Sequence, residues 1–348
     1  MRLSDLPTEL LQHVFLSCTS VPDALNLAAT CHRLHKVFTA SQKLSILLQA
    51  AEAQFGPLDE AIQLVTHNDS QAAHIHREVL FSLALLRQLM VVGRVAVRWE
   101  EIYPIKKWKH DFENRRLLTS LERFRVRRAI YRLWLYDKAF HTRTYPRFSR
   151  KHRTVVLERA ELLHNWSTAE LAEIEDVRHT VRDVLQNHVC PSNGTIQRKY
   201  RKRFPDNDQE LVFNIHLNYP PAPPALSDFQ QRFHAVRQAT QSNKYSSKYA
   251  SAAQHELGAE GWGDEIPHYY VVEDMLKLDP GQILWLRDHA PLKGQVESFV
   301  RGLGEWFENN GETMGETVEW VVKERGGDVE ELREGIEKCA LGVITGKE

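Results

Sequence analysis

The fold is decided at residues 3–15, which read Leu3-Ser4-Asp5-Leu6-Pro7-Thr8-Glu9-Leu10-Leu11-Gln12-His13-Val14-Phe15. Pro7 suits the first turn of a helix, because its missing N–H has no intrahelical partner there and its φ angle is already helical. The apolar residues that follow recur at helical spacing and form one stripe. The stretch therefore predicts an amphipathic helix that begins near Pro7.

Two further short helices are predicted, one from Pro22 and Asp23 to about Thr30 and one from Arg33 to Phe38. Three short helices in forty residues enclose little apolar surface, so they need a partner or the rest of the chain to be stable. Their apolar side chains are therefore either the core of a larger helical protein or a docking surface.

The pattern Leu-Pro-x-Glu-Leu-Leu-x-x-Val-Phe at residues 6–15, followed by Cys-x-Arg-Leu at residues 31–34, resembles an F-box. The resemblance covers about the first eighth of the chain and departs from the family at Cys18, where a leucine is common. It implies that the N-terminal helices bind the Skp-type adaptor, and through it the cullin, of an SCF-type ubiquitin ligase. The implied adaptor contacts are Leu6, Pro7, Leu10, Leu11, Val14, Phe15, Leu25, Leu27, Cys31 and Leu34.

Composition indicates a globular chain, with 42% apolar and 26% charged residues among 348. The four cysteines are scattered, which argues against a disulfide framework or a zinc site. The first residues lack the apolar run of a signal peptide, and the longest apolar run, residues 79–86, is too short to cross a membrane. We expect a soluble protein without membrane contact, in the cytoplasm, the nucleus or both.

Helical periodicity continues along most of the chain and predicts an all-α fold. It predicts two helices around a break at residues 55–57 and a longer apolar helix at residues 72–92. It also predicts one or two helices at residues 157–188, with Ser167 as a cap. The expected organisation is a three-helix F-box lobe at residues 1–45 and a large, irregular multi-helix domain at residues 46–348, with a possible loop-rich break at residues 190–226. The linker after Phe38 is neither long nor rich in Pro and Gly, so we expect the lobe to pack on the helical domain, which would recruit a protein substrate of unknown identity.

A helix predicted at residues 112–140 is apolar on two opposite sides, which places it at the centre of its domain. Its basic residues lie between these two sides. They either bind an acidic or phosphorylated segment of the substrate or form internal ion pairs with carboxylates of the acidic C-terminal part. We favour internal pairs, because residues 94–153 hold 18 Lys or Arg and residues 256–348 hold 21 Asp or Glu. The candidate substrate-binding residues are Arg116, Arg123, Arg127 and Arg128.

No catalytic motif is recognisable, so we predict no enzyme activity, catalytic residue or cofactor. Cys31 and His35 share one helix face but lack further ligands, and we predict no metal site. The alternative to a ligase subunit is an interaction scaffold outside any ligase, with nucleic-acid contact through residues 94–153 and 198–203. Aromatic residues that could stack on bases are few there, so we expect no nucleic-acid binding.

Overall fold

The computed structural model describes residues 6–40, 42–192, 268–291 and 293–346, together with Thr195 and Arg198. Every regular element in this part of the chain is helical, so the predicted all-α class is confirmed. The described residues form two compact units: the first takes residues up to 139, 161–177 and 320–346, and the second takes 140–160 and 178–319. The predicted domain boundary at residue 45 falls inside the first unit, and most of the predicted break at 190–226 lies outside the described residues.

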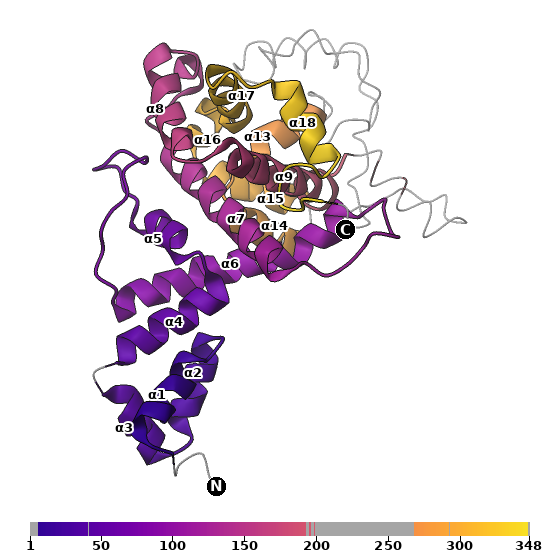
Figure 1. The fold of residues 1–348 in the computed structure, drawn as a ribbon. Helices are drawn as coiled ribbons and strands as arrows, with labels where there is room; N and C mark the ends of the chain where they lie inside the picture. Colours follow the sequence, from indigo (N-terminus) through magenta and orange to yellow (C-terminus); the bar gives the residue numbers. More distant parts are fainter. Residues whose placement is uncertain are drawn as a thin grey trace, which may run out of the picture. The chain divides into compact units, whose positions relative to one another are not determined.

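The first unit is built around seven helices from the N-terminal part of the chain (Figure 1). Parts of α8 (Arg153–His164), α9 (Thr168–Val184) and α17 (Met314–Glu324) and the whole of α18 (Val329–Glu337) complete it. The seven helices are α1 (Thr8–Leu16), α2 (Val21–Ala29), α3 (His32–Thr39), α4 (Lys43–Phe55), α5 (Leu58–Thr66), α6 (Leu83–Lys107) and α7 (Ser120–Phe140), whose last residue belongs to the second unit.

The first three helices have the bounds that their sequence signals predict, and they pack on α4. The Ser20 hydroxyl caps α2 by accepting from the Asp23 N–H at 3.2 Å. Phe15 is fully buried, and its ring lies 5.6 Å from that of Phe38. Each of α1, α2 and α3 contacts α4, and the Val21 N–H donates to Gln54 Oε1 on α4 at 3.0 Å. Since α4 begins at Lys43 and contacts α6 in turn, the packing continues across the predicted boundary.

A close approach between α4 and α6 fixes their packing. A Cβ atom added to Gly93 on α6 would meet the Phe55 ring at 2.5 Å, so the absence of a side chain lets the two helices meet. The predicted break at residues 55–57 is confirmed, because α4 ends at Phe55 and α5 begins at Leu58.

Helix α6 begins later than the apolar pattern predicted, at Leu83 instead of near residue 72. The Ser82 hydroxyl accepts from the Leu85 N–H at 3.2 Å and so caps the helix. Upstream, the Gln63 side chain donates to the Ala73 carbonyl at 2.9 Å, and Arg77 donates to the Thr66 carbonyl at 3.0 Å. These bonds hold residues 72–82 in a non-helical path.

Helix α7 also begins later than predicted, at Ser120 instead of residue 112. A capping box sets this start: the Thr119 N–H donates to Glu122 Oε2 at 2.7 Å, and the Glu122 N–H donates to the Thr119 hydroxyl at 3.3 Å. The prediction of a helix buried on two sides is confirmed, with Val126 and Ile130 on one side and Tyr131 on the other all inaccessible to solvent.

The helix predicted at residues 157–188 is divided in two. Helix α8 (Arg153–His164) ends before Ser167, and α9 (Thr168–Val184) begins after it. Ser167 is the predicted cap: its hydroxyl accepts from the Glu170 N–H at 3.3 Å, and the Glu170 carboxylate accepts from the Ser167 N–H at 2.9 Å.

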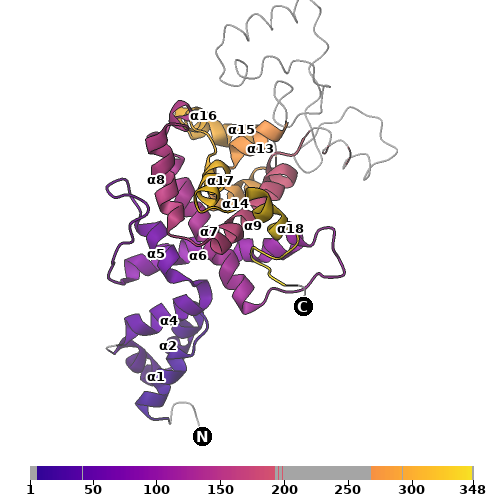
Figure 2. The same ribbon diagram turned by 45° about the horizontal axis from the view of Figure 1, so that its top comes forward.

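Among its described residues, the second unit contains the 3₁₀ helix η2 (Arg147–Ser149), the π-helix η3 (Leu185–Val189) and four short α-helices that lie wholly within it. Figure 2 shows these helices grouped together in orange. Both α13 and α14 contact η3. The helices are α13 (His268–Met275), α14 (Pro280–His289), α15 (Lys293–Gly302) and α16 (Glu305–Asn309).

A buried polar network holds this unit together. The Lys277 ammonium group lies 3.0 Å from Asp274 and donates to the Asn310 carbonyl at 3.2 Å. The Asn310 amide donates to the Thr142 and Tyr145 carbonyls at 2.9 and 2.7 Å. These contacts offset part of the desolvation penalty of burying the two charges.

Candidate functional site

The N-terminal helices present large apolar side chains to solvent. On α1, Leu10 is 48% exposed; Pro7 is exposed and Val14 half-buried at helical spacing on the same side. On α2, Leu25 is 45% exposed. These four residues, Pro7, Leu10, Val14 and Leu25, are called the exposed apolar residues of α1 and α2 below. Exposed leucines on helices this short are candidates for contact with a partner.

The remaining predicted adaptor contacts have different positions. Leu11, Phe15 and Leu34 are buried in the packing of α1–α4, so they support the exposed residues and cannot touch a partner. Leu6 and Leu27 are half-buried, and Cys31 is the exposed N-cap residue of α3. The structure thus separates the ten predicted residues into interior and outward groups, a distinction that the sequence pattern did not make.

The outward side of α3 is polar and basic. His32, Arg33, His35 and Lys36 are all exposed there. Arg33 also donates to the Leu6 carbonyl at 2.7 Å and so fixes the residue that precedes Pro7. The start of α1 is therefore held by a side chain of α3.

The candidate substrate-binding arginines all form internal ion pairs in the first unit. Arg116 contacts both carboxylate oxygens of Glu122 at 2.7 Å, although it precedes α7 instead of lying on it. Arg123 and Arg127 lie 3.6 and 3.5 Å from Glu100. These pairs favour the internal-ion-pair interpretation over a substrate groove.

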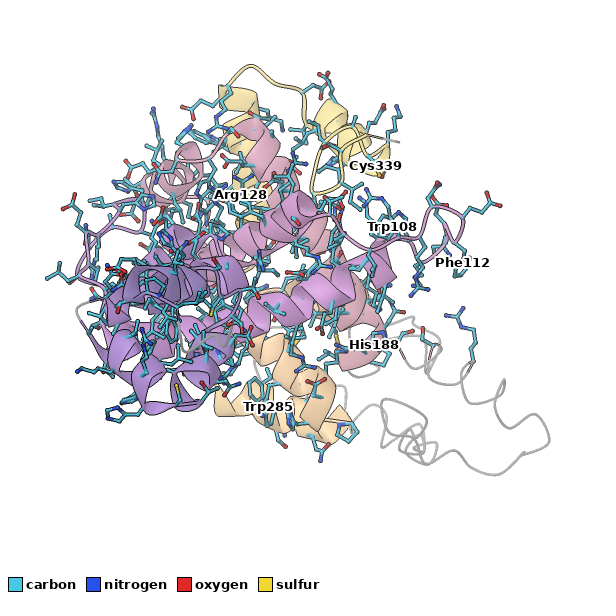
Figure 3. The ribbon with its side chains drawn as sticks, turned by 60° about the horizontal axis from the view of Figure 1, so that its bottom comes forward. Trp108, Phe112, Arg128, His188, Trp285 and Cys339 are labelled. Atoms are coloured by element: carbon cyan, nitrogen blue, oxygen red, sulfur yellow. The ribbon has the colours of Figure 1, made fainter. Side chains whose placement is uncertain are left out.

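Arg128 and Arg132 on α7 share the Glu170 carboxylate, and Figure 3 labels Arg128. Arg128 lies 2.7 Å from Glu173 and 2.9 Å from Glu170. Arg132, which the sequence did not single out, lies 2.6 Å from Glu60 and 3.1 Å from Glu170. Its guanidinium also stacks over the Trp166 ring at 5.1 Å, a cation–π contact.

The pKa values of Glu173 and Glu170 are shifted in opposite directions. Burial raises the pKa of Glu173, and the nearby Arg128 only partly offsets it. Burial also opposes ionisation of Glu170, but the Ser167 N–H and the two guanidinium groups outweigh it and lower the pKa of Glu170. The ion pairs are therefore part of the packing between helices.

The prediction that carboxylates of the acidic C-terminal part pair with the arginines of α7 was wrong. The carboxylates that pair with Arg116 and with the α7 arginines named above lie on α5, α6, α7 and α9, and none of these α7 arginines pairs with a described carboxylate of the acidic C-terminal part. Pairs of the expected kind do occur in the second unit. Arg150 lies 3.0 Å from Glu316, and Arg147 pairs with Asp274.

Asp176 on α9 forms a buried polar centre that the sequence did not reveal. Its carboxylate accepts from the Tyr103 hydroxyl at 2.6 Å, from Lys107 at 2.7 Å and from the Val343 N–H at 3.1 Å. The helical spacing gives no signal for it, because Asp176 falls on the side of α9 opposite the apolar stripe of Leu171, Ile174, Val177, Val181 and Val184. Because a protein backbone segment and two side chains fill its hydrogen-bonding capacity, this centre is structural.

No group of three or more His, Cys, Asp or Glu side chains within the described residues is arranged to hold a metal ion. None of the described helices combines the length and the apolarity needed to cross a membrane. In the basic cluster predicted at residues 198–203, only Arg198 is described; it donates to the Thr195 hydroxyl at 3.2 Å.

No protein-family model, curated protein or solved structure matches this chain. The functional argument therefore rests on the residues and their geometry. Among the sites above, Leu10 and Leu25 are large apolar side chains that the packing of the N-terminal helices leaves about half exposed.

Proposed function

We propose that α1–α3 form an F-box that docks on a Skp-type adaptor. The chain then acts as the non-catalytic, substrate-recruiting subunit of an SCF-type cullin ubiquitin ligase, in the cytoplasm or the nucleus. The observation that carries this proposal is the exposure of Leu10 and Leu25 on helices whose interior is already filled by other residues. Covering the exposed half of one such leucine favours association by on the order of 1 kcal/mol.

The proposal assigns two roles to the ten residues of the F-box pattern. The exposed apolar residues of α1 and α2 contact the adaptor, and Cys31, Leu6 and Leu27 lie at the margin. Leu11, Phe15 and Leu34 hold the helices in place. A variant of an interior residue would therefore lose adaptor binding only by unfolding the helices.

Substrate recruitment is assigned to the helical body, but not to the arginines that were candidates. Arg116, Arg123, Arg127 and Arg128 each have a carboxylate partner within their own unit. Recruiting a phosphorylated or acidic segment through the largely buried Arg127 and Arg128 would require breaking their pairs with Glu100 and Glu173.

Co-purification with a recombinant Skp-type adaptor tests the proposal. We expect wild type to retain the adaptor and the double variant Leu10→Glu, Leu25→Glu to lose it while circular dichroism shows unchanged helix content. Leu121→Glu is the control, because Leu121 on α7 is a leucine that is at least as exposed as Leu10 and Leu25. Absence of binding by wild type, or equal binding by the double variant, would overturn the proposal.

A second experiment separates a ligase subunit from a scaffold. The adaptor complex, isolated from cells, should contain the cullin and partners that carry polyubiquitin. Recovery of the adaptor without the cullin would support the scaffold alternative instead.

A further inference from the structure

The outward face of α6 combines exposed apolar residues with unpaired positive charge. Leu83 is 41% exposed, Val91 is 60% exposed and Val95 is half-buried at helical spacing. Arg87 and Arg94 lie on the same side and are exposed. These five residues, Leu83, Arg87, Val91, Arg94 and Val95, are called the α6 ridge below.

The packing of α6 explains why this face points outward. Its opposite face contacts α4 and α5 through a buried stripe, and Gly93 brings the helix close to Phe55. The stripe consists of Leu85, Leu86, Leu89, Val92, Gly93, Ala96 and Trp99. The α6 ridge is therefore presented by a rigid, well-supported helix.

The ridge is positively charged along its whole length. No Asp or Glu occurs from residue 79 to residue 99. Within the described residues, neither Arg87 nor Arg94 forms an ion pair, in contrast to the arginines of α7. Two cations seven residues apart, with an exposed valine between them, present alternating charge and apolar surface along about 18 Å of helix.

We infer that the α6 ridge docks a helical protein segment in which carboxylates alternate with apolar side chains. Carboxylates about seven residues apart would meet Arg87 and Arg94, and an apolar side chain between them would cover Val91. Val91 and Leu83 favour a protein partner over a nucleic acid, because a phosphate backbone offers nothing to cover an exposed apolar side chain. This inference does not depend on adaptor docking.

A designed peptide tests the inference on the full-length chain. The probe is a fluorescent amphipathic helical peptide with glutamates seven residues apart and leucines between them. Two further peptides carry glutamine or lysine in place of the glutamates. We expect binding by the glutamate peptide and at least about tenfold weaker binding by the glutamine peptide.

Charge reversal on the protein provides the decisive comparison. The variant Arg87→Glu, Arg94→Glu should bind the glutamate peptide at least about tenfold more weakly and should gain affinity for the lysine peptide. The matched control Arg115→Glu, Arg143→Glu reverses two other exposed arginines and should bind the peptides as wild type does. Circular dichroism checks that both variants are folded, since all four replaced arginines are exposed.

Three results would overturn the inference. They are no binding of the glutamate peptide by wild type at millimolar concentration, equal binding by the charge-reversed variant, and tighter binding of single-stranded DNA or anionic phosphatidylserine vesicles than of the peptide. Because the assay contains no adaptor, its outcome is independent of the proposed F-box function.

Discussion

The hydroxyl of Tyr103 on α6 donates to the Asp176 carboxylate on α9 across 2.6 Å. Burial raises the pKa of Tyr103 well above its ordinary value, and the charge of Asp176 adds to this effect. The same carboxylate binds Lys107 and the backbone of Val343, so one buried side chain ties two helices to the C-terminal segment of the first unit.

Asp176→Ala should lower the free energy of unfolding by about 3–5 kcal/mol, because it leaves the buried Lys107 charge and the Tyr103 hydroxyl without their acceptor. Urea unfolding measures this loss, and hydrogen exchange at the Val343 amide should accelerate. Glu331→Ala, at an exposed position of α18, is the control and should change stability by less than about 0.5 kcal/mol. Similar losses in both variants would show that Asp176 is not a structural centre.

The losses of unfolding free energy in Phe15→Ala and Leu10→Ala should distinguish an interior residue of the N-terminal helices from a surface residue. Phe15 is fully buried, so its truncation should cost about 3–5 kcal/mol. The Leu10 side chain is about half exposed, so its truncation should lower the free energy of unfolding by less than about 1 kcal/mol. Thermal unfolding followed by circular dichroism tests both values, and a larger loss for Leu10→Ala would contradict the assignment of inside and outside.

Arg132 and Glu60 should show strong energetic coupling. Their side chains are largely buried and lie 2.6 Å apart, so Arg132→Met alone leaves a buried carboxylate and should cost about 3–5 kcal/mol. The double variant with Glu60→Gln should lose less than the sum of the two single changes, by about 0.5–3 kcal/mol. A double-mutant cycle in urea measures this difference, and strict additivity would rule out a meaningful ion pair.

Acid should destabilise the second unit through His141. Burial lowers the pKa of His141 to about 4, even though Glu312 nearby favours the charged form. In the unfolded chain His141 has an ordinary pKa of about 6.5, so below that pH it binds a proton that the buried imidazole of the folded chain does not bind. The free energy of unfolding should therefore fall by roughly 3 kcal/mol as the pH drops from about 6.5 to about 4.

The variant His141→Gln tests the origin of this acid sensitivity. It should flatten the dependence of unfolding free energy on pH in the same window, whatever its effect on stability at neutral pH. The lowered pKa of Glu312 leaves part of the acid sensitivity in place, because that carboxylate also takes up a proton more readily when unfolded. Equal slopes for variant and wild type would exclude His141 as a source.

Local signals in the sequence were sufficient for many helix boundaries. The break at residues 55–57 and the cap at Ser167 depend on backbone chemistry within a few residues, and both were predicted. The starts of α6 and α7 were missed because apolar residues continue upstream of the true caps. At Thr119 the signal Thr-x-x-Glu was present in the sequence, but the helical pattern back to residue 112 concealed it.

Contacts between distant residues could not be predicted from pattern alone. Composition indicated that the arginines would pair internally, but opposite net charge of two segments does not identify individual partners. Glu100 and Glu173 became partners because α6 and α9 pack beside α7. The separation of Leu10 from Leu11 had the same origin, since the positions of α3 and α4 decide which leucine of α1 faces inward.

The docking of Val343 on Asp176 has a consequence for how the protein is made. The first unit needs residues 320–346, which leave the ribosome after the whole second unit has been synthesised. Domains usually fold in order from the N-terminus during translation. Until residues 320–346 emerge, Asp176 lacks the Val343 N–H and Lys107 lacks the Ile336 carbonyl. Nascent chains that stop before these residues should therefore be bound by chaperones that recognise exposed apolar helices.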